Sequence, residues 1–159
     1  LVISDVQRIP PEAVDPRIKN FHWLDLTQGI FDAYDRDAFV AVLTDRDGNV
    51  IEGAGFNIFS VKGTTLVTPD RGVFEGMTRR TVLEIAPSLG LDAECRPIAA
   101  GELAQADEII LTSSAGGIMP VTTLDGTPVG SGSPGAIRYE ASPFTSLSVP
   151  ASSCSGGWR

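Results

Sequence analysis

Lysine is scarce in this sequence, and one of its two lysines stands where it could do covalent chemistry. Lys19 lies between a proline-rich stretch and an apolar run that contains Phe21 and Trp23. An amine that apolar neighbours desolvate becomes nucleophilic and can form a Schiff base with a carbonyl group. The alternative is that the Lys19 stem packs on Trp23 while its ammonium group stays in water. Lys62 lies in the sequence VKGT, which is typical of a hairpin tip, so we expect it to be solvated.

A carboxylate that could assist such an amine lies inside a strand-like run. Glu52 stands in VIEGAG at 50–55, among apolar and very small residues. A buried carboxylate is costly unless it is paired, whereas small neighbours leave room for a flat ring to approach the backbone. The alternative is that Glu52 faces solvent from one side of a hairpin strand.

Two further segments could bind an anion. A helix is predicted to begin after Gly76, and free N–H groups in its first turn, at Met77 and Thr78, favour a phosphate group. The hydroxyl groups of residues 112–114 end a buried-looking strand and could also bind phosphate or carboxylate oxygens. The alternatives are an ordinary helix start and a turn whose serines bond their own backbone.

Taken together, these features supply the parts of one cofactor site. Pyridoxal phosphate needs a lysine for its aldehyde, an acid for its pyridine nitrogen and donors for its phosphate. Lys19 and Glu52 fit the first two roles, and Met77, Thr78 and Ser114 fit the third.

The elements that must position these residues form a mixed α/β pattern with many hairpins and few βαβ units. The first helix is expected to use Leu24, Ile30 and Phe31 as apolar positions. A hairpin is indicated by the turn sequence DRDG at 45–48. We expect strands at 2–9, 39–44, 50–55, 57–61, 65–68, 91–98, 108–112, 118–124 and 127–129, helices at 21–34 and 77–86 with an end at Gly90, and a helical turn at 101–106.

The bulk properties argue against several other classes of protein. A net charge of -8 disfavours nucleic acid or an anionic membrane as the main partner, and no apolar run reaches the roughly 20 residues that span a bilayer. Cys95 and Cys154 lack metal-site spacing, so we expect free thiols and a cytoplasmic protein. With His22 as the single histidine, neither a zinc site nor a Ser-His-Asp hydrolase is expected.

The order of several segments carries a family resemblance. Lys19 is followed by IEGAGFNIF at 51–59, TP at 68–69, GMTR at 76–79, ADEIILT at 106–112 and IMPV at 118–121. This order resembles the class IV aminotransferases, which are the fold-type IV pyridoxal-phosphate enzymes. The family includes branched-chain and D-amino acid aminotransferases, aminodeoxychorismate lyases and (R)-selective amine transaminases. The segment KNFHWLDL at 19–26 is most similar to the branched-chain-like and (R)-amine transaminase members.

The resemblance runs from about residue 1 to about residue 130 and implies a fold and a cofactor. The fold would be the large C-terminal cofactor domain of fold-type IV enzymes, and the cofactor would be pyridoxal 5'-phosphate. Lys19 would hold the cofactor as a Schiff base and move a proton between the substrate α-carbon and the cofactor C4′. Glu52 would keep the pyridine nitrogen protonated.

The same resemblance implies an anion-binding end and a substrate pocket. Met77 and Thr78, together with Ser114, would hold the phosphate, and Ala115 would line the pocket for a substrate carboxylate or small substituent. Leu24 stands where branched-chain enzymes usually place a tyrosine, so the contact to the cofactor hydroxyl group has no candidate.

The reaction implied is transamination between an amino acid of branched-chain type, or a small chiral amine, and a 2-oxo acid, in a homodimer. The alternatives are an aminodeoxychorismate lyase, a D-amino acid aminotransferase, or a truncated cofactor domain without activity. The family's smaller N-terminal domain is missing, so we expect a fragment, with a cofactor domain at residues 1–138. Residues 139–159, rich in serine, are expected to be a disordered or non-native tail.

Overall fold

The computed structural model describes residues 1–135 and residue 137, so the expected tail at 139–159 lies outside the described residues. The described part has the mixed α/β architecture that the sequence predicts, built from two mixed sheets, a small hairpin and three α-helices. Within it, no helix combines the length and the apolar character needed to cross a membrane.

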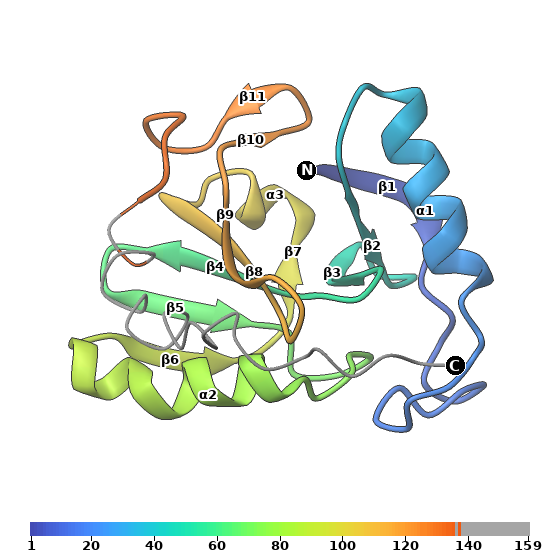
Figure 1. Cartoon of the computed structure of the whole chain (residues 1–159), viewed down its shortest axis with the longest axis horizontal. Coiled ribbons are helices and arrows are strands. Elements are labelled where there is room, and N and C mark those ends of the chain that lie inside the picture. Colours follow the sequence, from blue (N-terminus) through green and yellow to red (C-terminus); the bar gives the residue numbers. More distant parts are fainter. Residues whose placement is uncertain (136, 138–159) are drawn as a thin grey trace, which may run out of the picture.

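The first sheet carries the N-terminal strand and lies next to helix α1 (Figure 1). Its strand order is β1-β2-β3-β7, and β1 and β2 run parallel because α1 connects them, whereas the other pairs are antiparallel. Asp45 shapes the predicted β2–β3 turn, since its Oδ1 accepts the N–H groups of Asp47 and Asn49 at 2.9 and 2.8 Å. The elements are β1 (Val2–Gln7), α1 (Leu24–Asp35), β2 (Ala41–Thr44), β3 (Asn49–Gly53) and β7 (Ile98–Ala99).

The second sheet has the order β6-β5-β4-β8-β9. Helix α2 and the 3₁₀ turn that follows it connect the parallel neighbours β5 and β6, and the remaining pairs are antiparallel. Gly90 ends this helical segment in the left-handed region, with φ of 73°. The elements are β4 (Asn57–Lys62), β5 (Thr65–Thr68), α2 (Met77–Ile85), the turn Ala86–Leu89, β6 (Asp92–Cys95), α3 (Ala100–Leu103), β8 (Glu108–Ser113), β9 (Gly117–Val121), β10 (Thr123–Leu124) and β11 (Thr127–Pro128).

Alternation along the central strands divides the core into two layers. Ile58 and Ile109 join Val42 and Val50 in the cluster between the two sheets. Their chain neighbours belong to a second cluster, which includes Phe59, Ile110 and the α2 residue Val82. Because successive strand residues point to opposite faces, the second sheet is buried on both sides.

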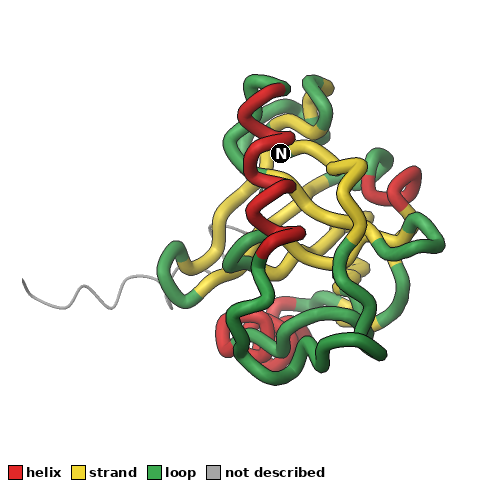
Figure 2. Tube along the Cα trace, turned by 90° about the vertical axis from the view of Figure 1, so that its right-hand side faces the viewer, coloured by secondary structure: helices red, strands yellow, loops and turns green. Residues whose placement is uncertain are grey.

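Helix α1 covers the outer face of the first sheet with one leucine and two small residues, a face that differs from the predicted one. Its buried residues are Leu26, Gly29 and Ala33, whereas Leu24 and Phe31 are 73% and 60% exposed. A Cβ on Gly29 would lie 2.5 Å from Leu43 Cδ1, so the helix approaches the sheet too closely for a larger residue. Figure 2 shows α1 crossing in front of the strands.

The predicted strand at 91–98 is two strands in two different sheets. β6 pairs with β5, and the Arg96 N–H then donates to the Thr68 carbonyl group at 3.1 Å. Pro97 has no N–H group to continue a ladder, and Ile98 pairs instead with Val50 of β3.

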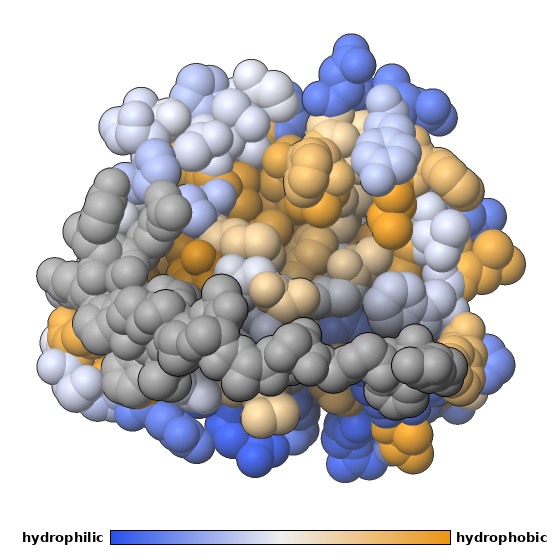
Figure 3. Space-filling view, in the orientation of Figure 1, coloured by the Kyte–Doolittle hydropathy of each residue, from blue (hydrophilic) through white to orange (hydrophobic). Residues whose placement is uncertain are grey.

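Apolar surface occupies much of the middle of the face seen in Figure 3. A cavity of about 610 Å³ lies beside the N-terminus and β9, and Leu1, Phe39, Leu111 and Met119 are among its lining residues. Large apolar side chains are also exposed along α1 and in the segment before it; they are Ile18, Phe21, Trp23, Leu24, Phe31 and Tyr34.

Candidate active site

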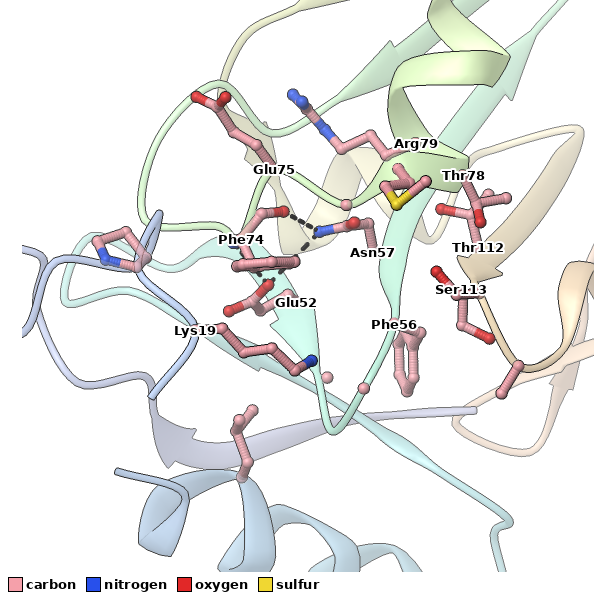
Figure 4. A pocket seen from close by; sticks show the side chains of 18 of the residues that line it. Lys19, Glu52, Phe56, Asn57, Phe74, Glu75, Thr78, Arg79, Thr112 and Ser113 are labelled. Carbon is pink, nitrogen blue, oxygen red and sulfur yellow. Dashed lines mark hydrogen bonds between the residues drawn. The ribbon is translucent and has the colours of Figure 1, made fainter. Parts of the chain in front are cut away.

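A separate cavity of about 420 Å³ brings all six predicted site residues together. It lies where β3 and β8 end and β4 and α2 begin, and the segment before α1 closes one side (Figure 4). Since these segments are distant in the sequence, the two sheets must be assembled before the cavity exists. The six residues are Lys19, Glu52, Met77, Thr78, Ser114 and Ala115.

Lys19 presents its amine to this cavity from the segment before α1 (Figure 4). Its Nζ lies 5.3 Å from the centroid of the Phe74 ring, within the range of a cation–π contact. Within residues 1–135 and 137, no hydrogen bond or ion pair engages this amine. The prediction that Phe21 desolvates Lys19 is wrong, because Phe21 is fully exposed and Lys19 is itself an exposed residue.

Glu52 is buried, with a relative exposure of 5%, so it does not lie on a solvent face of β3. Its Oε1 accepts Nε and Nη2 of Arg8 at 3.3 and 3.2 Å. Its Oε2 accepts the Phe74 N–H at 2.9 Å and Asn57 Nδ2 at 3.4 Å. Burial raises the pKa of Glu52 above its ordinary value, although the Phe74 N–H and the Arg8 guanidinium oppose that shift.

Arg8 extends from the end of β1 and joins Glu52 to a second carboxylate, Asp25 in the first turn of α1. The Arg8 Nη1 donates to Asp25 Oδ2 at 2.7 Å, and the same oxygen accepts the Ile9 N–H at 2.7 Å. Burial opposes ionisation of Asp25, but its hydrogen bonds from the Ile9 N–H, from Arg8 and from the Leu26 N–H outweigh burial and lower its pKa.

The part of the cavity wall formed by the start of α2 and the end of β8 carries several hydrogen-bond donors. Helix α2 begins after Gly76 and has no side-chain cap, so the N–H groups of its first turn are available to an anion. Thr112 is 1% exposed, and its Oγ1 is buried without a partner in the described part of the chain. Ser113 Oγ accepts the Gly116 N–H at 2.8 Å, whereas Ser114 is exposed.

Glycines let these segments approach one another closely. A Cβ on Gly53 would lie 2.3 Å from the Ala41 carbonyl oxygen and 2.1 Å from the Phe56 ring. A Cβ on Gly76 would lie 2.4 Å from Asn57 Oδ1, so the start of α2 packs directly on the Asn57 side chain.

Sequence reasoning missed several residues of this site. Arg8, Asp25 and Phe74 were not predicted, nor was the orphaned hydroxyl group of Thr112. Asn57 is part of the segment that carries the family resemblance, but no role was derived for it. The high cost of burying Glu52 was the available signal, because that cost demands a nearby cation.

A metal centre has no basis in the described residues, among which no group of three or more His, Cys, Asp or Glu side chains is placed to hold an ion. Cys95 is a free, exposed thiol, and Cys154 lies outside the described residues.

Comparisons with known proteins identify the family of this chain. A family model described as amino-transferase class IV matches residues 1–124. A probable branched-chain-amino-acid aminotransferase of Thermotoga maritima is 37% identical over 128 residues, which are 77% of this chain and 45% of the relative. A D-alanine aminotransferase of Bacillus licheniformis is 36% identical over 107 residues, which are 66% of this chain and 38% of the relative.

A solved structure agrees with the fold as well. The branched-chain amino acid aminotransferase of Thermobaculum terrenum in its PLP-form superimposes with a TM-score of 0.85 and 30% identity, over 90% of this chain and 48% of that one. The chain therefore spans about half the length of the relatives it matches. With a family match over most of its length and a shared fold, this chain belongs to the class IV aminotransferases.

Proposed function

We propose that this chain binds pyridoxal 5'-phosphate in the 420 Å³ cavity and supplies the cofactor site of an aminotransferase. The observation that carries the proposal is the position of three unlike groups around one cavity: the amine of Lys19, which pairs with no other described residue, the buried carboxylate of Glu52, and the free N–H groups at the start of α2. A lysine, an acid and an anion site are what this cofactor requires.

The residues present fit the cofactor at both ends. At the anion end, the first-turn N–H groups at Met77 and Thr78 and the hydroxyl group of Ser114 would hold the phosphate. The unpartnered Thr112 Oγ1 marks a buried polar position on the same wall, and a bound phosphate could satisfy it. At the other end, Glu52 would accept a hydrogen bond from the protonated ring nitrogen.

When bound, the cofactor supplies an electron sink for the carbanion that forms at the substrate α-carbon. Lys19 would hold the cofactor through Nζ, and the same amine would carry a proton to and from the substrate α-carbon. Glu52 would keep the ring nitrogen protonated, and the Phe74 ring lies beneath the lysine amine. Ala115, on the loop after β8, would leave room for the substrate carboxylate or a small substituent.

For the substrate, we propose an amino acid of branched-chain type or a small chiral amine as donor and a 2-oxo acid as acceptor. The name of the T. maritima relative and that of the T. terrenum structure support the branched-chain assignment. A D-amino acid donor is the second candidate, because a D-alanine aminotransferase matches at similar identity.

We also propose that the chain works as a homodimer. The support is the set of large apolar side chains exposed on and before α1, where Phe21 is fully exposed and Leu24 and Phe31 are more than half exposed. Exposed apolar surface of this kind is typical of a face that another chain covers. Light scattering at several protein concentrations measures the association.

Covalent trapping tests the cofactor site, and the second lysine provides its control. Lys62 donates to Asp107 Oδ1 and to the Gln105 carbonyl group, each at 2.8 Å, and is not among the residues that line the cavity. After addition of pyridoxal 5'-phosphate and reduction with borohydride, peptide mass mapping should find the adduct on Lys19. The Lys19→Ala variant should lose it, while Lys62→Ala should retain it.

Equal labelling of both lysines, or an adduct that survives Lys19→Ala, would refute the assignment. Absence of any adduct would indicate a truncated domain without a working site. If the adduct forms, single-turnover absorbance changes with L-leucine, D-alanine and (R)-1-phenylethylamine separate the substrate candidates. A response to D-alanine alone would replace the branched-chain assignment with the D-amino acid one.

A further inference from the structure

Three charged side chains lie together, mostly out of contact with solvent, at one end of the cavity. The side chains of Arg8, Asp25 and Glu52 are 8%, 15% and 6% exposed. Two carboxylates therefore share one guanidinium group, and the cluster carries one negative charge in excess when both are ionised. Other charged groups that line the cavity are Lys19, Glu75 and Arg79.

The guanidinium group is not shared equally. Its contact to Asp25 is 2.7 Å, within the range of a strong charge-assisted hydrogen bond. Its two contacts to Glu52 are 3.2 and 3.3 Å, and both converge on a single oxygen, so they do not form a parallel two-pronged pair. Arg8 is therefore directed mainly toward Asp25, and the charge of Glu52 is only partly compensated.

The other oxygen of Glu52 keeps capacity for a ligand. Its contact from Asn57 Nδ2 is long at 3.4 Å, and Asn57 Nδ2 already donates to the Phe74 carbonyl group at 2.8 Å. A ring N–H that approached this oxygen could therefore replace the contact from Asn57, because Asn57 would keep its shorter hydrogen bond.

We propose that Asp25 is a positioning residue for the cofactor site: by holding Arg8, it keeps Glu52 incompletely neutralised and leaves one negative charge for a protonated ring nitrogen. This inference rests on the proposed cofactor and deepens it. Asp25 does not touch the cavity itself and acts through Arg8. If Arg8 were free to pair with Glu52 alone, the cluster would be neutral and would favour the protonated ring less.

A purely structural role for Asp25 must be distinguished from this one, because Asp25 also accepts the N–H groups of Ile9 and Leu26 at 2.7 and 2.8 Å. If Asp25 had only a structural role, its replacement would change the stability of the fold but not the electrostatics of the cavity. The discriminating variant is Asp25→Asn, which keeps an acceptor oxygen and removes the charge. Asp25→Ser is a second neutral variant, whose hydroxyl group can accept one of these N–H groups, and Asp25→Glu should restore the charge.

Asp32→Asn is the matched control. It makes the same substitution in the same helix, where Asp32 lies 3.5 Å from the partly exposed Arg36 rather than near the cavity. The first readout uses the full chain without cofactor, with the Glu52 carboxyl carbon followed by ¹³C NMR during a pH titration and assigned with Glu52→Gln. The second uses ¹⁵N-labelled pyridoxal phosphate bound to the same proteins and follows the ring nitrogen signal.

In Asp25→Asn, the midpoint of the Glu52 titration should fall, because a nearby negative charge is lost and Arg8 becomes fully available. The ring nitrogen signal should move toward that of a neutral pyridine. In Asp25→Glu and in Asp32→Asn, the Glu52 midpoint and the ring nitrogen signal should both stay as in the wild type. The inference is overturned if Asp25→Asn and Asp25→Ser fold but leave both readouts unchanged, or if Asp32→Asn moves them as much.

The cofactor assignment and the role of Asp25 can be refuted independently of each other. If the wild type forms no adduct on Lys19, the cofactor assignment fails, whatever the titration shows. If the adduct forms and the Glu52 midpoint does not respond to Asp25, the cofactor site stands and the role of Asp25 is refuted.

Discussion

Replacing Arg8 by methionine removes the cation that, in the described part of the chain, pairs with the two mostly buried carboxylates, while the similar side-chain length limits the cavity that is left. Arg8 donates three hydrogen bonds, of 2.7, 3.2 and 3.3 Å, to Asp25 and Glu52. Removing one side of a buried ion pair costs about 3–5 kcal/mol, because the remaining charge is uncompensated. Since a domain is stable by only roughly 5–15 kcal/mol, Arg8→Met should lose a large fraction of the free energy of unfolding.

Urea denaturation followed by circular dichroism measures this loss, and Arg46→Met is its control. Arg46 and its partner Glu12 are 70% and 75% exposed and lie 3.9 Å apart, so that substitution should cost no more than about 1 kcal/mol. A cost for Arg8→Met as small as that of Arg46→Met would refute the reasoning.

The cost should also depend on pH, and the sign follows from the two carboxyl groups. In the wild type, the pKa of Asp25 is lowered by its hydrogen bonds, so its contribution is present above the unfolded pKa and is lost as pH falls through the folded one. The pKa of Glu52 is raised by burial, so its ionisation destabilises the fold as pH rises above the unfolded value. Without Arg8, both carboxyl groups should bind protons more tightly in the folded variant.

The destabilisation by Arg8→Met should therefore be largest near neutral pH and shrink toward about pH 4.5, where the carboxyl groups can be protonated. Denaturation curves at both pH values test this expectation. A difference from the wild type that stays constant between them would mean that lost packing, rather than uncompensated charge, causes the instability.

Two further substitutions test the packing of α1 and the wall of the cavity. Gly29→Ala should destabilise the chain by about 1–3 kcal/mol in thermal or urea unfolding, because its Cβ would lie 2.5 Å from Leu43 Cδ1. Gly101→Ala in α3 meets nothing within 4 Å and should be neutral or stabilising, so equal effects would contradict the packing argument. Thr112→Val removes a buried hydroxyl group without a described partner, so stability should stay unchanged or rise by up to about 1 kcal/mol, while pyridoxal 5'-phosphate binds more weakly in a fluorescence titration. A marked loss of stability in Thr112→Val would show that this hydroxyl group has a partner within the protein.

The sequence predicted turns and helix ends well where they depend only on residues that are neighbours in the chain. The turn at Asp45 and Gly48 and the end of the second helical segment at Gly90 depend on residues that are adjacent in the chain. The face of α1 could not be predicted in the same way. Apolar periodicity selects the large residues Leu24 and Phe31, but at Gly29 the helix lies too close to the sheet for a side chain. That requirement depends on Leu43, which belongs to another element.

Rare or conspicuous residue types made some site residues predictable and left others hidden. Lys19 could be singled out because the chain has two lysines, and Glu52 because a carboxylate interrupts an apolar strand. Arg8 is one of many arginines and lies 44 residues from Glu52, so no local pattern pairs them. The roles of the predicted residues remain predictions, although the cavity brings all six together.

The buried cluster connects the fold to the site. Arg8 directly follows β1, Asp25 lies in the first turn of α1 and Glu52 lies on β3. Their contacts therefore connect three elements of the first sheet layer to the cavity, which Arg8 and Glu52 line. A buried ion triad is a poor source of stability compared with apolar packing of similar volume. Its presence is better explained by what it offers a ligand, which is a fixed carboxylate in a cluster with one negative charge in excess. On that reasoning, variants that replace the triad with apolar residues could be as stable as the wild type, but they would lose the acid that the ring nitrogen requires.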